Sequence, residues 1–426
     1  ADWAAAFANI DGVRVALYFD DSAEFAAALF GAWHAGKEAV LPADALPGTW
    51  HRLLGLVSAS ASDAGVVQGL PRVQPTASAP APAVWPELDP QRIAVHVFTS
   101  GSTGVPELIP KRLAQLAAEV RALEDCFATR IGRGCVHASV SHQHMYGLPF
   151  LVLWPLASGR AFSSRRLGFP EDIRHALAIT PDAVLVTSPA HLKRLPEQLD
   201  WTPGRARLAA VFSSGGPLAG DALALCGRAL GQVPIEVYGS SETGAVAWRQ
   251  REDGRDTHWQ PLPGMTVRIA GECLQMAAPW LQDSGWQDSA DRAVADGAGF
   301  ALRGRADRIV KIEEKRVSLD AFERELVSTG LLLDARAVVL AGGRSRIGIV
   351  AIPNAAGWAL HDADGRRAFS QRLRAVLATS AEAVVLPRRW RFSWALPLNA
   401  TGKTTTAALL ALFDPRRPHA RLLEHT

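Results

Sequence analysis

Short apolar runs alternate with segments of helical periodicity along most of the chain. Residues 13–19 (VRVALYF) and 39–41 predict buried strands, and the Ala- and Phe-rich stretch 23–35 between them predicts a helix. Further strands are predicted at 94–98, 183–188, 208–214 and 234–240. This alternation is typical of a layered α/β fold, in which ligands bind where the strands end.

Two segments interrupt the alternation. Residues 58–91 are rich in Ala, Ser and Pro, which predicts a surface linker. From Arg305 onward the pattern changes to a compact α+β set with charged helices. We therefore expect two domains, a larger one at 1–304 and a smaller one at 305–426.

The apolar segments do not indicate a membrane protein or a secreted one. The longest, Leu148 to Ala157, is too short to span a bilayer and predicts buried sheet or helix. The N-terminus lacks a basic region followed by an apolar stretch, so no secretory signal is expected. The cysteines, at positions 126, 135, 226 and 273, show neither metal-ligand spacing nor a disulfide framework. We expect a protein of the reducing cytoplasm.

The distribution of charge is more informative than the total. A formal net charge of +3 is too small to indicate nucleic-acid binding. Residues 308–426 contain 19 Lys and Arg against 11 Asp and Glu, a net charge of +8, whereas the remainder carries −5. A basic C-terminal region suggests an acidic partner. A solvated Arg-rich surface is an equally open explanation.

The segment 97–112 (VFTSGSTGVPELIPKR) contains the strongest local signal. A predicted strand leads into a loop of hydroxyl residues and glycines from Thr99 to Gly104. Glycines allow close approach of the backbone to an anion, and consecutive N–H and hydroxyl groups can surround phosphate oxygens. An ordinary loop is the alternative. The spacing of the lysine-bearing P-loop is absent.

Three further loops carry candidate chemistry. In 237–244 (VYGSSETG), Tyr238 offers a flat face for a base and Glu242 offers an oxygen ligand to Mg²⁺, although a glutamate at such a position, taken alone, is more often a surface carboxylate. The next is 304–325 (GRADRIVKIEEKRVSLDAFERE). The last, 396–410 (LPLNATGKTTTAALL), presents Lys403 in a loop otherwise poor in charge.

These four loops, in this order, resemble the acyl-adenylate-forming superfamily. That superfamily contains acyl- and aryl-CoA synthetases, the adenylation domains of nonribosomal peptide synthetases, and luciferases. The resemblance runs from about Val13 to Leu410. It implies a large N-terminal adenylation domain and a smaller, mobile C-terminal domain. It also implies that a carboxylate attacks the α-phosphate of ATP, that pyrophosphate leaves, and that a thiol then takes the acyl group.

The resemblance also assigns roles to residues. The phosphates of ATP would be held by Thr99, Ser100, Gly101, Ser102, Thr103 and Gly104. The adenine and acyl pocket would be lined by the loop 213–218 with Ser214, Gly215 and Gly216. The other nucleotide contacts would come from Tyr238 on adenine, Ser241 on the α-phosphate, Glu242 on Mg²⁺, Thr243 beside them, and Asp291 and Arg305 on the ribose. The catalytic residues would be Lys403 and His144, with Asp307 as the hinge of the C-terminal domain. His142 and His137 are expected to be bystanders.

The sequence departs from the family pattern at several positions. Glu107 stands where a lysine usually follows the phosphate loop, and Lys111 is a candidate substitute. Glu314 occupies the position of a glycine that packs near the incoming thiol. Ser289 precedes Asp291 in place of the usual threonine. The chain also has less sequence before Thr99 than most family members.

The short form and the segment KIEEKRVSL resemble compact AMP-ligases of bacterial aryl-polyene and xanthomonadin-type pigment pathways. That resemblance implies a small aromatic acid such as 4-hydroxybenzoate, with His144 and Tyr146 as pocket walls, and an acidic acyl carrier protein whose phosphopantetheine thiol is the acceptor. A ligase that uses free CoA is the alternative, and an amino-acid-activating domain is less favoured. A catalytically silent adenylate-binding protein is the alternative of another class.

Overall fold

The computed structural model describes most of the chain, as two compact units. The described residues are 1–63, 65, 69–75, 84–99, 107–251, 258–282, 285–312, 315–340, 346–379, 381, 383–398 and 404–414. The first unit contains Ala1–Arg268, Gln275–Gln287 and Ala295–Ala301, and the second contains Ile269–Leu274, Asp288–Val294 and Leu302–Thr426. Both units combine strands with helices, so the predicted α/β class is confirmed.

A five-stranded sheet opens the first unit, in the order β3-β1-β2-β4-β5. Its elements are β1 (Arg14–Tyr18), β2 (Glu38–Leu41), β3 (Ala59–Ser62), β4 (Ile93–Thr99) and β5 (Glu107–Arg112), with helices α1 (Asp2–Ala8), α2 (Ser22–His34) and α3 (Pro47–Leu53). The first four strands run parallel, and β5 returns antiparallel to β4. The strands and helix predicted within 13–41, and the strand predicted at 94–98, are confirmed.

The surface linker predicted at 58–91 is wrong at its start. Ala59–Ser62 form β3, and all four residues are buried. Ala and Ser are common in loops, but such small side chains also fit a crowded strand at the side of a sheet. The parallel ladder with β1 on one side, and hydrogen bonds of Ser60 to Pro71 and Val73 on the other, satisfy the backbone groups.

A six-stranded sheet, in the order β11-β10-β9-β8-β7-β6, forms the second layer system of the first unit. Its strands are β6 (Val136–Ala138), β7 (Ala183–Thr187), β8 (Leu208–Ser213), β9 (Ile235–Ser240), β10 (Gly244–Gln250) and β11 (Gln260–Pro261). The strands from β6 to β9 run parallel, and β10 and β11 are antiparallel. The three strands predicted between 183 and 240 are therefore confirmed, and their carboxyl ends share one edge.

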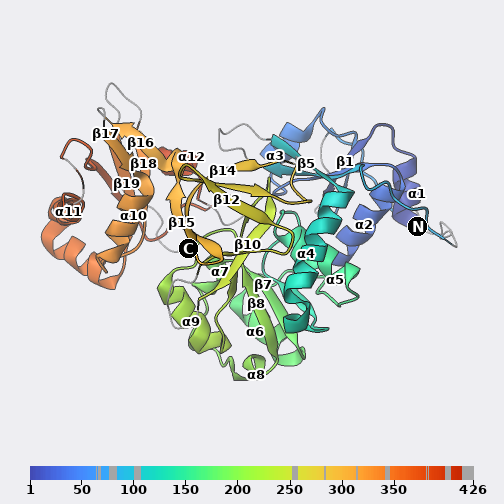
Figure 1. Cartoon of the computed structure of the whole chain (residues 1–426), viewed down its shortest axis with the longest axis horizontal. Coiled ribbons are helices and arrows are strands. Elements are labelled where there is room, and N and C mark those ends of the chain that lie inside the picture. Colours follow the sequence, from blue (N-terminus) through green and yellow to red (C-terminus); the bar gives the residue numbers. More distant parts are fainter. Residues whose placement is uncertain are drawn as a thin grey trace. The chain divides into compact units, whose positions relative to one another are not determined.

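Helices cover both faces of this sheet (Figure 1). They are α4 (Leu113–Ile131), the π-helical turn η1 (Leu148–Leu153), α5 (Trp154–Ala157), α6 (Pro170–Ile179), α7 (Pro189–Leu192), α8 (Thr202–Arg205) and α9 (Gly220–Leu230). Val211 of β8 lies in a buried cluster with residues of α6 and α9. Its neighbour Phe212 faces the other layer, with its ring 5.0 Å from Phe127 of α4 and 6.0 Å from Trp154 of α5. The apolar run 148–157 is thus helical.

A four-stranded sheet, β12-β13-β14-β15, contains residues of both units. Its strands are β12 (Thr266–Ala270), β13 (Cys273–Ala277), β14 (Gln287–Asp296) and β15 (Gly299–Arg305). The second unit continues with the turn η3 (Ala306–Arg308), the hairpin β16 (Ile309–Ile312) and β17 (Lys315–Ser318), and α10 (Leu319–Ser328). It ends with the sheet β18 (Leu332–Leu340), β19 (Arg346–Pro353) and β20 (Arg389–Phe392), and helices α11 (Ala355–Leu377) and α12 (Thr406–Ala411).

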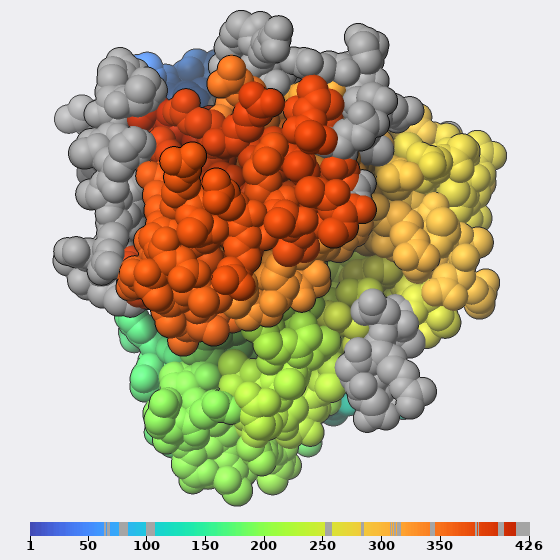
Figure 2. Space-filling model, turned by 90° about the vertical axis from the view of Figure 1, so that its left-hand side faces the viewer, coloured from blue at the N-terminus to red at the C-terminus, as the bar shows by residue number. Residues whose placement is uncertain are grey.

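The second unit has a core of its own. Phe322 of α10, Ile349 of β19 and Leu373 of α11 belong to one buried cluster. Its outer surface, coloured orange to red, is seen in Figure 2. The α+β set predicted after Arg305 is confirmed by these elements. In the described part of the chain, every helix is too short or too polar to cross a bilayer.

Candidate functional site

The phosphate loop predicted from Thr99 to Gly104 leaves the sheet at the end of β4. Thr99 is the last residue of β4 and pairs with Glu107, the first residue of β5. Ser100–Gly104 lie outside the described residues, and so does Lys403. The sheet therefore fixes the two points between which the predicted loop runs. Glu107, at the position of the expected lysine, is exposed.

The loop 213–218 and the motif at Tyr238 lie side by side because β8 and β9 are parallel neighbours. Ser213 pairs with Glu236, and the buried hydroxyl of Ser214 donates a hydrogen bond to the carbonyl of Val237 at 2.8 Å. Gly215 and Gly216 follow Ser214 directly, and a side-chain carbon at either would meet no atom of a non-adjacent described residue within 4 Å. An open, glycine-lined surface therefore flanks the end of β9.

Tyr238 is half-buried at the carboxyl end of β9. Its ring centroid lies 5.6 Å from that of Trp259 and 6.0 Å from that of Phe300. These two rings fix the plane of Tyr238 from one side. A ring held in this way can stack on a planar base without first losing side-chain freedom.

The turn between β9 and β10 presents Glu242 to solvent. Thr243 is buried, and its hydroxyl accepts a hydrogen bond from the N–H of Ser240 at 3.0 Å. The N–H of Thr243 in turn donates to the hydroxyl of Ser240 at 3.2 Å. Ser241 is half-buried and Glu242 is exposed. Thr243 thus shapes the turn, and Glu242 is its outward carboxylate.

The turn offers one carboxylate, so it could bind Mg²⁺ only together with ligands from elsewhere. No group of three or more His, Cys, Asp or Glu side chains within the described ranges is arranged to hold a metal ion. Proteins commonly bind Mg²⁺ through one or two carboxylates together with the phosphates of a substrate. The single exposed carboxylate of Glu242 fits that mode of binding.

Two buried charged groups lie beneath this turn, and the sequence analysis did not find Glu119. Lys111 of β5 and Glu119 of α4 are each 2% exposed. The ammonium of Lys111 donates to the backbone carbonyl of Glu242 at 2.5 Å, and the carboxylate of Glu119 accepts from the N–H of Ala245 at 2.8 Å. The signal for Glu119 is its place on the apolar face of the helix, four residues before the buried Leu123.

The segment after β6 contains the predicted His144. Its neighbour His142 is buried, with Nδ1 3.0 Å from the hydroxyl of Ser22, and burial lowers the pKa of His142 to about 4. His142 is therefore a neutral interior histidine, as expected. His144 is half-buried, and its carbonyl accepts the N–H of Leu148 at 2.8 Å where the helical segment begins.

A row of hydroxyls marks the carboxyl ends of β6, β7 and β8. Ser139 and Thr187 are hydrogen bonded at 2.7 Å, and Thr187 pairs with Ser213 in the parallel ladder. The hydroxyls of Ser213 and Tyr146 are both buried, and neither makes a hydrogen bond of ordinary geometry with another described residue. Burial raises the pKa of Tyr146 well above its usual value, and the backbone of Thr187 opposes this rise.

The predicted ribose contacts lie in the second unit. Asp291 of β14 is half-buried, and its carboxylate accepts from the hydroxyl of Ser289 at 3.1 Å. The same hydroxyl accepts the N–H of Asp291 at 2.9 Å. Serine in place of the family's threonine therefore still orients this aspartate. The backbone of Asp307 lies in η3, and its side chain is outside what the structure describes.

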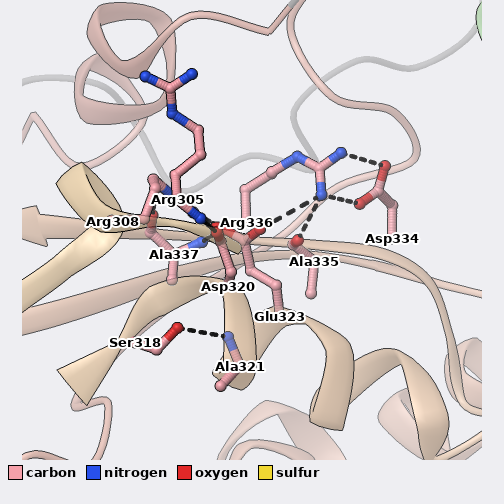
Figure 3. Close-up of polar contacts among 10 residues, drawn as sticks. All are labelled: Arg305, Arg308, Ser318, Asp320, Ala321, Glu323, Asp334, Ala335, Arg336 and Ala337. Carbon is pink, nitrogen blue, oxygen red and sulfur yellow. Dashed lines mark hydrogen bonds and ion pairs between the residues drawn. The ribbon is translucent and has the colours of Figure 1, made fainter. Parts of the chain in front are cut away.

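Residues 304–308, the predicted hinge segment, are attached to α10 through Asp320 (Figure 3). The carboxylate of Asp320 accepts from the backbone N–H of Arg305 and from Nε of Arg308, each at 2.9 Å. Gly304 has a φ of +93°, and a side-chain carbon there would lie 2.9 Å from this carboxylate. The close approach and the positive φ together require glycine.

Glu323, one turn further along α10, extends the network. It accepts from the guanidinium of Arg308 and from the N–H of Ala337. Arg336 lies 3.6 Å from Glu323 and 2.9 Å from Asp334. Two acidic residues of α10 thus hold Arg308 between them.

A family model described as AMP-binding enzyme matches residues 8–280. A 4-coumarate–CoA ligase of Cereibacter sphaeroides is 29% identical over 316 residues, which are 72% of this chain and 68% of that protein.

Two solved structures share the fold. One is ATP-bound MatB from Rhodopseudomonas palustris, with a TM-score of 0.80 and 17% identity over 97% of this chain and 92% of that one. The other is a benzoate CoA ligase from Burkholderia xenovorans, with a TM-score of 0.74 and 19% identity over 96% and 91% of the two chains. At these identities the likeness establishes the fold alone.

We predict that Asp320→Ala loosens the hinge segment. The substitution removes the acceptor of the Arg305 N–H, so amide exchange at Arg305 should accelerate at least about tenfold, as for loss of a charged hydrogen-bond partner. Asp334→Ala is the matched control, since its carboxylate has similar exposure, 21% against 19%, and binds only Arg336 in this network. Equal exchange at Arg305 in the two variants would contradict the assignment.

Proposed function

The chain belongs to the AMP-binding enzyme family, and on this premise we propose that it joins a small aromatic acid to AMP and passes the acyl group to the phosphopantetheine thiol of an acyl carrier protein. At the coarser level the chain is an ATP-dependent, AMP-forming acid–thiol ligase. The observation that carries the proposal is the pairing of β8 with β9. It brings the start of the glycine-lined loop 213–218 next to the end of β9, where Tyr238 lies and after which the turn with Glu242 follows.

In the proposed first step, a carboxylate oxygen of the acid attacks the α-phosphorus of ATP and pyrophosphate leaves. Tyr238 stacks on the adenine, and Ser241 binds the α-phosphate. Glu242 binds the Mg²⁺ that accompanies ATP. Lys403 neutralises the charge that develops between the carboxylate and the α-phosphate. Positioning and electrostatic stabilisation then supply most of the rate.

In the proposed second step, the thiol attacks the acyl carbon and AMP leaves. The loop Thr99–Gly104 has by then released pyrophosphate, and Asp291 and Arg305 hold the ribose of the remaining nucleotide. A rotation about Asp307 would exchange Lys403 for the thiol-binding surface. His144 would lie next to the acid's carboxyl group. This division between residues 1–304 and 305–426 stays a prediction.

The hydroxyls at the ends of β6 to β8 support an aromatic acid with a polar substituent. The buried hydroxyl of Ser213 makes no hydrogen bond with another described residue, and the buried hydroxyl of Tyr146 interacts with the backbone of Thr187. Buried hydroxyls with donor or acceptor capacity to spare usually meet a ligand or water. The ring of Phe150 lies 4.9 Å from that of Tyr146 and 5.4 Å from that of Phe212. Aromatic rings packed next to hydroxyls would suit a hydroxybenzoate. The names of the 4-coumarate–CoA ligase and benzoate CoA ligase relatives point to the same class.

A panel of acids tests the proposal by pyrophosphate release. We expect 4-hydroxybenzoate and related aromatic acids to react, and long-chain fatty acids and amino acids to react poorly. Tyr146→Phe should lower kcat/KM about tenfold or more for a hydroxybenzoate, because a buried hydrogen bond is lost, and should leave benzoate nearly unchanged. Tyr18→Phe is the matched control, in the other sheet of the first unit.

Two results of the panel would be decisive against the proposal. Strong activity with long fatty acids and none with benzoates would overturn the aromatic substrate. No pyrophosphate release with any acid from a folded protein would favour the catalytically silent alternative.

The exposed arginines of the second unit support a carrier protein as acceptor. Arg367, Arg372, Arg388 and Arg389 are exposed. Acyl carrier proteins are usually acidic, and opposite charges raise association rates in a salt-dependent way. Arg391 does not belong to this surface, because it is buried and donates to the carbonyl of Leu412.

Free CoA is the second candidate acceptor. The family relative reported above is named a CoA ligase, and the phosphates of CoA would also favour a basic surface. Glu314, where the family has the glycine near the thiol, weighs in favour of the carrier protein. Glu314 itself lies outside the described residues.

Loading assays at several salt concentrations separate the two acceptors. We expect transfer to a holo carrier protein to dominate and to slow as salt rises, because charged surfaces are screened. Reversal of charge at Arg388 and Arg389 to Glu should slow loading without slowing adenylate formation. The matched control reverses Arg133 and Arg207, two exposed arginines of the first unit. Efficient, salt-insensitive transfer to CoA alone would overturn the carrier-protein proposal.

A further inference from the structure

Lys111 and Glu119 are two buried side chains of opposite charge, and the hydrogen bonds that they make with described residues go to one short piece of backbone. That piece, named the bulge segment, is residues 242–245, which end the turn after β9 and begin β10. Lys111 contacts it at the carbonyl of Glu242, 2.5 Å away, and Glu119 contacts it at the N–H of Ala245, 2.8 Å away. Burial of a charged side chain costs free energy unless its hydrogen bonds are replaced. Here the replacements are the carbonyl of Glu242, the proposed metal ligand, and the N–H of Ala245, three residues after it.

The sheet itself leaves these backbone groups in need of partners. The ladder between β9 and β10 slips between Ala245 and Ala247, as at a β-bulge. A bulge leaves backbone groups unpaired in the ladder. Both backbone groups of Ala245 are instead satisfied by side chains, the N–H by Glu119 and the C=O by Nε1 of Trp280 at 3.0 Å. The carboxylate of Glu119 therefore completes an irregular sheet just after the turn, near the start of β10.

The bulge segment fits closely over Glu119. Gly244 has a φ of +66°, and a side-chain carbon at this position would lie 2.7 Å from a carboxylate oxygen of Glu119. A residue with a side chain would therefore both strain the backbone and displace the carboxylate. The absence of a side chain at Gly244 lets the turn pack directly against Glu119, which fixes the position of the turn relative to α4.

Burial and the neighbouring charges shift the pKa values of both Glu119 and Lys111. Burial is the largest influence on Glu119 and raises its pKa to about 7, while the N–H of Ala245 and the charge of Lys111 lower it. Burial also lowers the pKa of Lys111, and the charges of Glu119 and Glu242 oppose this. Lys111 thus lies in the field of two carboxylates. One is buried below it and the other is exposed at the turn.

We propose that Lys111 and Glu119 are positioning residues that hold Glu242 in place for the Mg²⁺ of bound ATP. They act through the backbone of the bulge segment and contact neither ATP nor the acid. Lys111 in this role does not replace the phosphate-loop lysine whose place Glu107 takes, because its ammonium is used at the turn. The inference rests on the proposed role of Glu242 as a ligand of Mg²⁺.

The experiment is a Mg²⁺ titration of pyrophosphate release, with the acid and ATP saturating. Lys111→Met and Glu119→Gln should each raise the Mg²⁺ concentration at half-maximal rate, Lys111→Met by about tenfold, as for loss of one charged hydrogen bond. Glu242→Gln is the reference. Glu124→Gln is the matched control, because this carboxylate lies on the same helix and is ion-paired to Arg160 at 2.5 Å, away from the bulge segment.

A double-mutant cycle separates positioning from general stability. If Lys111 acts through Glu242, adding Lys111→Met to Glu242→Gln should raise the Mg²⁺ requirement little further, whereas independent effects would multiply. The isosteric Glu119→Gln gives a second test should Lys111→Met fail to fold. Thermal unfolding of each variant accompanies the titrations.

The outcomes separate the metal role of Glu242 from the positioning role of Lys111 and Glu119. If Glu242→Gln leaves the Mg²⁺ requirement unchanged, the proposed metal role and this inference both fail. If Glu242→Gln raises it while Lys111→Met and Glu119→Gln behave like Glu124→Gln, the positioning role is overturned and the proposed function stands. A raised requirement with a non-multiplicative double variant supports the inference.

Discussion

The parallel pairing of β6, β7, β8 and β9 is the constraint on which the candidate site depends. Parallel strands end at one edge of a sheet, so segments distant in the sequence meet there. The hydroxyls of Ser139, Thr187 and Ser213, the glycines after Ser214, and the ring of Tyr238 all come to this edge. A change of register by one residue in any of these strands would turn its terminal side chain to the opposite face.

The layers on either side keep that register. In β8, Val211 and Phe212 point into different hydrophobic layers. A shift of register by one residue would put each side chain into the layer packed around the other, where its size does not fit. Near the turn between β9 and β10, a bulge within β10 interrupts the ladder. There Lys111 and Glu119 supply hydrogen bonds to backbone groups, at the carbonyl of Glu242 and the N–H of Ala245. The predicted hinge segment in the second unit is held in a similar way, since Asp320 accepts from the backbone N–H of Arg305, and Asp320 and Glu323 accept from the guanidinium of Arg308.

Much of this organisation could be predicted from the sequence, because its signals are local. Apolar runs of strand length and the glycine-rich loops after them are visible without a structure, and the order of the loops indicates the family. Residues 59–62 were not predictable as a strand, because Ala and Ser carry little signal for sheet or loop. Glu119 was not predictable as a site residue, because its importance depends on a bulge about 125 residues further along the chain.

The central claim is that the chain activates a carboxylic acid by joining it to AMP, and the fate of the carboxyl oxygens tests it most directly. The acid is prepared with oxygen-18 in its carboxyl group and incubated with the protein, ATP, Mg²⁺ and a thiol acceptor, and the nucleotide product is analysed by mass spectrometry. When the thiol displaces AMP from the mixed anhydride, the bridging oxygen stays with the phosphorus. The account predicts AMP that carries one heavy oxygen. Unlabelled AMP, or ADP with labelled phosphate, would contradict it.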